Sequence, residues 1–104
     1  MKQGFTDIPN ELLEAVLRFR CPNGYKEVIL ALMRLTYGSG QREGAVSVLR
    51  LSRFINQDKS NTAKRLRELI RCKVVKETAR PTWTEARQLK INTHFKEWRE
   101  IEKC

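Results

Sequence analysis

Two short amphipathic segments on either side of the polar residues Asn56-Gln57-Asp58 limit most strongly what this chain can fold into. The spacing of their apolar residues predicts one helix over about 48–55 and another over about 59–72. The expected N-caps are Ser47 for the first helix and Asp58 or Ser60 for the second. Two short helices joined by a tight polar turn form a helix-turn-helix.

The flanking sequence extends this motif in both directions. Apolar spacing predicts helices over about 10–21 and 25–36, and the second of these should be the central buried helix. Residues 74–91 are expected to form two strands, Val74 to Thr78 and Arg87 to Ile91, and residues 93–103 a closing helix. The predicted fold is therefore mainly α with a small β-hairpin, a winged helix-turn-helix forming one domain over residues 1–104.

Helical spacing also predicts which side chains face the core, because residues three and four apart share one face. The set expected to point inward comprises Leu12, Leu13, Val16 and Leu17 in the first helix, Val48, Leu51, Phe54 and Ile55 in the third, and Thr62, Leu66, Leu69 and Ile70 in the fourth.

The basic charge of the chain is concentrated in the fourth predicted helix. The 104 residues contain 21 Lys and Arg against 12 Asp and Glu, a formal charge of +9. Residues 59–73 hold six of the basic side chains and one acidic side chain. A localised positive face favours nucleic acid as the partner, and the alternative is an ordinary solvated helix face.

Residues near the start of a helix in the major groove read bases, and residues further along contact phosphates. We therefore expect base contacts from Asn61, Lys64 and Arg65, and phosphate contacts from Arg67 and Arg71. The full candidate set on this helix is Lys59, Ser60, Asn61, Lys64, Arg65, Arg67 and Arg71.

The hairpin supplies a second candidate contact with DNA. A wing of this kind reaches a minor groove or the backbone. Its candidate residues are Arg80, Thr82, Thr84 and Arg87. Trp83 is interpreted as an anchor that packs against the hairpin, with insertion between bases as the alternative.

The sequence shows no signature of an enzyme. His94 is the single histidine, and the chain contains no GxSxG, HExxH or phosphate-binding glycine motif. Cys21, Cys72 and Cys104 lack metal-ligand spacing and are expected to be free thiols, with one intermolecular disulfide through Cys104 as the alternative. Free thiols indicate a cytoplasmic protein. We expect no catalytic site, no metal, no cofactor and no membrane partner.

Three segments resemble the N-terminal domain of the bacteriophage replication protein O family, the origin-binding initiators of lambda-like phages. These are GFTDIPNELLEAVLRF from Gly4, ALMRLTYGSG from Ala31 and LKINTHFKEW from Leu89. The recognition segment departs from the family pattern, which has a β-branched apolar residue near Thr62 and a glycine in the turn occupied here by residues 56–58.

The resemblance implies recognition of repeated sites at a phage or prophage replication origin. It also implies contact with the replicative helicase machinery, through a C-terminal region beyond Cys104. Self-association on repeated sites is expected on a separate ground, because a single small module buries a limited area of DNA. From the residues alone, two alternatives stay open. One is a transcriptional regulator with the same fold, and the other is a protein-interaction winged helix that binds an acidic partner.

Overall fold

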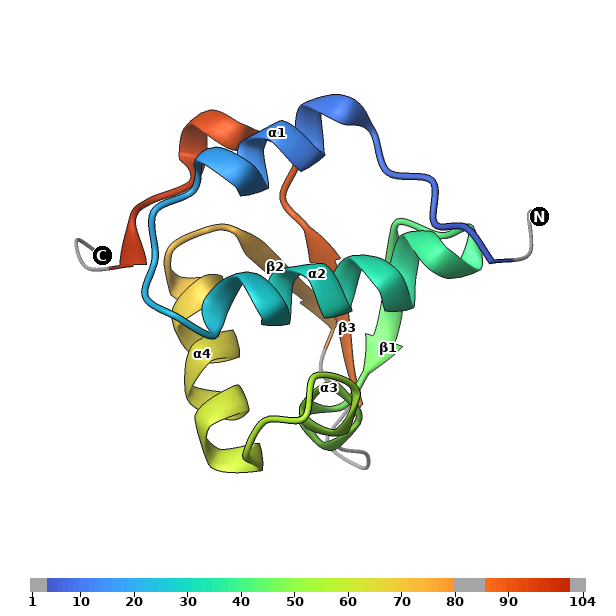
Figure 1. Cartoon of the computed structure of the whole chain (residues 1–104), viewed down its shortest axis with the longest axis vertical. Coiled ribbons are helices and arrows are strands. Elements are labelled where there is room, and N and C mark those ends of the chain that lie inside the picture. The colour runs from blue at the N-terminus through green and yellow to red at the C-terminus, as the bar shows by residue number, and fades with distance from the viewer. Residues whose placement is uncertain (1–3, 80–85, 102–104) are drawn as a thin grey trace.

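A helical N-terminal part is followed by a sheet whose strands come from both sides of the two short helices that flank residues 56–58 (Figure 1). A computed structural model describes residues 4–79 and 86–101. The elements within these residues are α1 (Asn10–Arg18), α2 (Tyr25–Thr36), the 3-10 turn η1 (Tyr37–Ser39), β1 (Glu43–Val46), α3 (Val48–Phe54), α4 (Lys59–Arg71), β2 (Val75–Ala79), β3 (Arg87–Ile91) and the 3-10 turn η2 (Phe95–Glu97). None of the helices in these ranges is long and apolar enough to cross a membrane.

Helix α2 lies at the centre of the core. Val28, Ile29 and Leu32 on this helix are completely buried, and the helix packs against α3, α4, β1 and β3. In Figure 1 it crosses the middle of the molecule, with α1 on one side and α3 and α4 on the other. The prediction of a central buried helix is confirmed, although Leu30 on its outer side is exposed.

The sheet is antiparallel, with the strand order β1-β3-β2. Strands β2 and β3 form the expected hairpin, in which Val75 lies opposite Ile91. Strand β1 pairs with the other edge of β3, where Gly44 lies opposite Leu89. The fold is therefore mixed α and β, with a larger sheet than the predicted hairpin, and its element order is compatible with a winged helix.

Local hydrogen bonds set the ends of α3 and α4. The Ser47 hydroxyl accepts from the Arg50 amide at 3.1 Å, and the Asp58 carboxylate accepts from the Asn61 amide at 3.1 Å. Asn56 between the helices has a φ of 55°, a left-handed conformation that Asn tolerates better than most residues. Asn56 thus allows the chain to reverse direction between α3 and α4 without a glycine.

The closing segment differs from its prediction. Over its described part, residues 93–101, the expected helix is wrong, and η2 (Phe95–Glu97) is a short 3-10 turn. Trp98 packs edge-on against Phe19 and Phe95 at centroid distances of 5.6 and 5.5 Å, and its Nε1 donates to the Asn92 carbonyl at 2.8 Å. These contacts hold the chain in an irregular conformation that apolar spacing alone does not reveal.

Asn92 is the polar centre of that segment and is itself buried. Its side-chain amide donates to the Lys73 carbonyl at 2.7 Å and to Glu97 Oε1 at 2.9 Å, and its side-chain oxygen accepts from the His94 amide at 3.0 Å. The Asn92 hydrogen bond is the main cause that lowers the pKa of the Glu97 carboxyl. One side chain thus ties the end of α4 to the C-terminal segment.

Two other helical predictions need correction. Helix α1 ends at Arg18, not near residue 21, because Phe19 adopts an extended conformation. Pro22 also disfavours a helical conformation at the residue before it, Cys21. Several apolar side chains expected inside are exposed instead, because α1 buries a narrow face and α3 has fewer than two turns. The exposed side chains are Leu13, Leu17 and Phe54. Three others are only partly buried: Val48, Ile55 and Ile70.

The cysteines also differ from expectation. Cys21 is a free thiol, and burial raises its pKa. Cys72 is completely buried and is disulfide-bonded, so the prediction of free thiols is wrong for this residue. Cys104 lies outside the described residues.

Tyr25, at the start of α2, joins that helix to α4. Its ring is buried, and its hydroxyl donates a hydrogen bond to the Glu68 carboxylate. Burial, and then the hydrogen bond to Glu68, raise the pKa of Tyr25 to about 12. The folded protein therefore holds the phenolic proton more tightly than an unfolded chain does.

Replacing Asn92 with Ala should lower the free energy of unfolding by about 2–4 kcal/mol, because the Lys73 carbonyl and the His94 amide lose a partner inside the protein. Urea unfolding measures this loss, and an NMR titration should show the pKa of Glu97 rising toward 4.5. Thr93→Ala, at an exposed neighbour, serves as the control. An equal effect of the two substitutions would contradict the role given to Asn92.

The Tyr25 contact predicts a loss of stability at alkaline pH. Because the folded-state pKa of about 12 exceeds the ordinary value of 10.0, its contribution is complete below pH 10 and is lost as the pH rises from 10 toward 12. Urea unfolding across that range should show a steeper loss for the wild type and Tyr37→Phe than for Tyr25→Phe. The same slope in all three proteins would refute this account.

Candidate nucleic-acid interface

Helix α4 is held by one buried face, which determines what its other face presents. Thr62, Leu66 and Leu69 are completely buried, and the helix packs against α2, α3 and β2. The Thr62 hydroxyl donates to the Asp58 carbonyl at 2.9 Å, so this polar group is satisfied inside the protein. The predicted inward positions are confirmed for these three residues.

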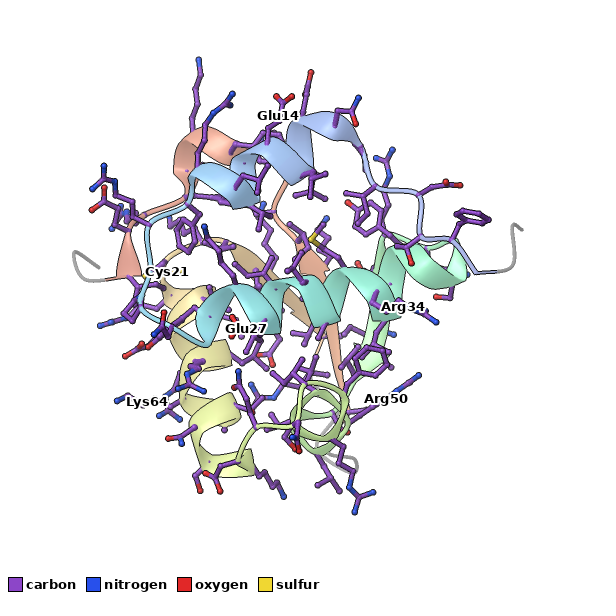
Figure 2. The ribbon with its side chains drawn as sticks, in the orientation of Figure 1. Glu14, Cys21, Glu27, Arg34, Arg50 and Lys64 are labelled. Carbon is purple, nitrogen blue, oxygen red and sulfur yellow. The ribbon has the colours of Figure 1, made fainter. Side chains whose placement is uncertain are left out.

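The opposite face of α4 carries a row of exposed side chains, which we call the α4 stripe: Ser60, Lys64, Arg67 and Arg71. Intervals of four, three and four residues place them on one side of a helix with 3.6 residues per turn. Figure 2 shows Lys64 projecting outward from α4. In the part of the chain that the structure describes, ion pairs involve Arg18 and Arg87, and none involves the stripe.

Lys59 and Asn61 flank the stripe at the start of α4, and both are exposed. Their backbone lies at the capped end of the helix, where the Asp58 carboxylate accepts from the Asn61 amide. Asn61 and Lys64 are three residues apart, and both are exposed near the N-terminal end of α4. This is the end of the helix where base-reading residues are expected. Their contact with DNA remains a prediction.

Arg65 is placed differently from the other candidates on α4. It is only partly exposed, and its Nη1 donates to Gln57 Oε1 at 2.7 Å. Its guanidinium carbon lies 5.9 Å from the centroid of the Tyr25 ring, within the range of a cation–π contact. In this structure the Arg65 head group is thus engaged inside the protein, and a base contact from it remains a prediction.

Gln57 extends this contact to the start of α2, because its side-chain amide donates to the Gly24 carbonyl at 3.2 Å. Gly24 has a φ of 96°, and a Cβ at this position would lie 2.6 Å from the Arg65 guanidinium carbon. The positive φ favours glycine at this position, and a side chain there would displace the Arg65 head group. We refer to Gly24, Gln57 and Arg65 as the Gln57 junction.

Helix α3 adds two exposed basic residues that sequence reasoning missed, Arg50 and Arg53. They lie three residues apart in a helix that buries Leu51 and Ser52, and α3 packs directly against α4. Figure 2 shows Arg50 on α3, below α2. The signal that could have revealed them is the basic outer face of the helix that precedes the polar turn.

Of the predicted wing residues, the structure describes only Arg87. Arg87 on β3 lies 3.4 Å from a Glu77 carboxylate oxygen, and both side chains are about one-fifth exposed. Its charge is thus balanced within the sheet, which sets it apart from the α4 stripe. Arg80, Thr82, Trp83 and Thr84 lie outside the described residues.

Comparison with known proteins places the chain in a family. A family model described as bacteriophage replication protein O matches residues 1–98, nearly the whole chain. A search of the curated proteins and a search of the solved structures each found no match. The match covers α3, α4 and the segments that resemble the family in sequence. This chain therefore belongs to the bacteriophage replication protein O family.

Proposed function

We propose that this chain is a winged helix-turn-helix domain that binds specific sequences in double-stranded DNA, and that it recognises a phage or prophage replication origin in the host cytoplasm. The observation that carries the proposal is the exposed cationic face of α4, directly after the α3–α4 turn, which forms no ion pair within the described residues. Membership of a phage replication family supports a role in replication.

The mechanism assigns separate tasks to the residues of α4. Its N-terminal end enters the major groove, where Asn61 pairs with adenine and Lys64 with guanine. Arg67 and Arg71, further along the exposed face, contact phosphates and provide affinity that depends on salt. The division follows from their order along the helix, since the stripe runs from its first turn to its last residue.

Helix α3 extends the phosphate contacts. In a helix-turn-helix the first helix crosses the DNA backbone while the second lies in the groove. Arg50 and Arg53 are exposed on that first helix, so they are suited to phosphates beside the groove that α4 enters. This adds two residues to the interface expected from the sequence.

Self-association on repeated sites is part of the proposal. A single module of this size buries a limited area of DNA, and neighbouring copies on repeated sites would raise the overall affinity. Contact with the replicative helicase machinery would require a region beyond residue 104.

Selection of bound duplexes from a random pool at about 150 mM salt tests the proposal directly, because electrostatics alone gives weak binding under those conditions. We expect one reproducible sequence motif, bound at least ~1000-fold more tightly than scrambled DNA. Absence of enrichment would refute specific recognition and favour binding of an acidic protein partner. The position of the selected motif in the genome would then distinguish a replication origin from a regulatory site.

Two substitutions on α4 should have different effects on the selected duplex. Asn61→Ala should reduce discrimination against scrambled DNA by about 1–3 kcal/mol, since a base contact is lost. Arg71→Ala should weaken both duplexes equally and make binding less sensitive to salt. Arg18→Ala, at an exposed position on α1, is the control. The assignment fails if Asn61→Ala weakens both duplexes to the same extent.

The Gln57 junction makes a further prediction about Arg65. Arg65→Ala should also reduce discrimination, and if Arg65 acts by positioning α4, Gln57→Ala should do the same, because the two side chains are joined by a 2.7 Å hydrogen bond. A double-mutant cycle on the selected duplex measures the coupling. Additive effects would show instead that Arg65 acts independently of Gln57.

A further inference from the structure

A small cationic hollow lies on the sheet, apart from the α4 stripe. Its volume is about 130 Å³, and it is lined from η1, β2, β3 and the segments beside them, with no residue from α3 or α4. The basic side chains that line it are Arg42, Lys76, Lys90 and His94. Three stretches distant in the sequence, around residues 42, 76 and 90–94, thus bring basic groups to one place.

The strand register explains why two of these lysines lie together. Val75 lies opposite Ile91, and both are buried, so the next pair, Lys76 opposite Lys90, occupies the outer face of the sheet. Like charges directly opposite each other on paired strands are destabilising. The sheet therefore holds two ammonium groups within reach of a single ligand, at a cost in stability.

Nearby acids do not fill the hollow. Glu43, on β1, lies opposite Lys90 in the strand register. Glu97 accepts a hydrogen bond from Asn92. Neither Glu43 nor Glu97 lines the hollow. The hydrogen bond from Asn92 is the largest effect on the pKa of Glu97 and lowers it, and desolvation raises it. The nearby charges of Lys76 and His94 are smaller effects that also lower this pKa. None of the four basic residues takes part in an ion pair within the described part of the chain.

We propose that this hollow binds a phosphate group. Arg42, Lys76 and Lys90 provide three permanent positive charges, and Arg and Lys are the side chains that proteins use to bind phosphate. The volume of about 130 Å³ is enough for several waters, and therefore for one phosphate. Tyr37 and Thr93 line the same space, and both residues carry a hydroxyl group. This inference is independent of the function proposed for α4.

Two sources of phosphate share this chemistry. One is the backbone of a nucleic acid, which would meet the protein on a face other than α4. The other is a free phosphorylated small molecule. A duplex read by α4 and a phosphate held at the sheet occupy different residues, so their binding can be measured separately.

The first test titrates the whole chain with inorganic phosphate at constant ionic strength and follows the NMR signals of residues 76, 90 and 94. We expect a saturable shift in the wild type and about tenfold weaker binding in Lys76→Gln and in Lys90→Gln, because each loses one charge-assisted hydrogen bond. Lys64→Gln is the matched control on α4 and should bind phosphate normally. Lys64 and Lys76 are exposed and Lys90 is partly exposed, and removing a like-charge pair leaves the fold intact.

Shifts that do not saturate, that chloride reproduces, or that persist unchanged in the Lys76→Gln and Lys90→Gln variants would overturn the proposal. The same variants should keep their discrimination between selected and scrambled duplexes, whereas Lys64→Gln should lose it. Failure of phosphate binding alone is thus distinguishable from failure of DNA recognition by α4.

A second titration identifies the source of the phosphate. A single-stranded oligonucleotide of a few residues that binds more tightly than inorganic phosphate, and loses this affinity in Lys76→Gln, would assign the site to a nucleic-acid backbone. A nucleoside monophosphate that equals the oligonucleotide would assign it to a small molecule. An oligonucleotide that binds without shifting the three signals would overturn the backbone assignment.

Discussion

Gln57 lies in the turn between α3 and α4 and contacts both α4 and the start of α2. Its side chain accepts from Arg65 at 2.7 Å and donates to the Gly24 carbonyl at 3.2 Å. A helix with one buried apolar face can still rotate slightly about its axis, whereas directional hydrogen bonds restrict that rotation. The outward direction of the α4 stripe, and thus any use of that face, depends on this junction together with the buried Thr62, Leu66 and Leu69.

The junction divides the basic residues of α4 into two groups with different physical environments. The guanidinium of Arg65 is held by Gln57 and Tyr25, where it contributes to the fold. Lys64, Arg67 and Arg71 face solvent, where a charge costs little to keep and remains available to an anion. The sheet shows the same contrast between engaged and available charges. Arg87 forms an ion pair with Glu77, whereas Lys76 and Lys90 form none within the described residues.

Sequence reasoning succeeded where the governing contacts are local. The ends of α2, α3 and α4 agree with their predictions to within one residue, because caps and apolar spacing act over three or four positions. It failed at residues 93–101, where Trp98 and Asn92 bond to parts of the chain that the spacing rule does not include. It also failed at Phe54 and Leu17, whose helices are too short or too peripheral to bury a second face.

By itself, the sequence determined the order of the four helices and of the two hairpin strands, the caps at Ser47 and Asp58, and the location of excess positive charge in α4, since these depend on neighbouring residues. Only the tertiary structure decided that Arg65 is engaged by Gln57 while Lys64 is exposed, and that Lys76 and Lys90 lie opposite each other on paired strands. The physical reason is that charge availability depends on partners brought close by strand register and helix packing, and those partners are distant in the sequence.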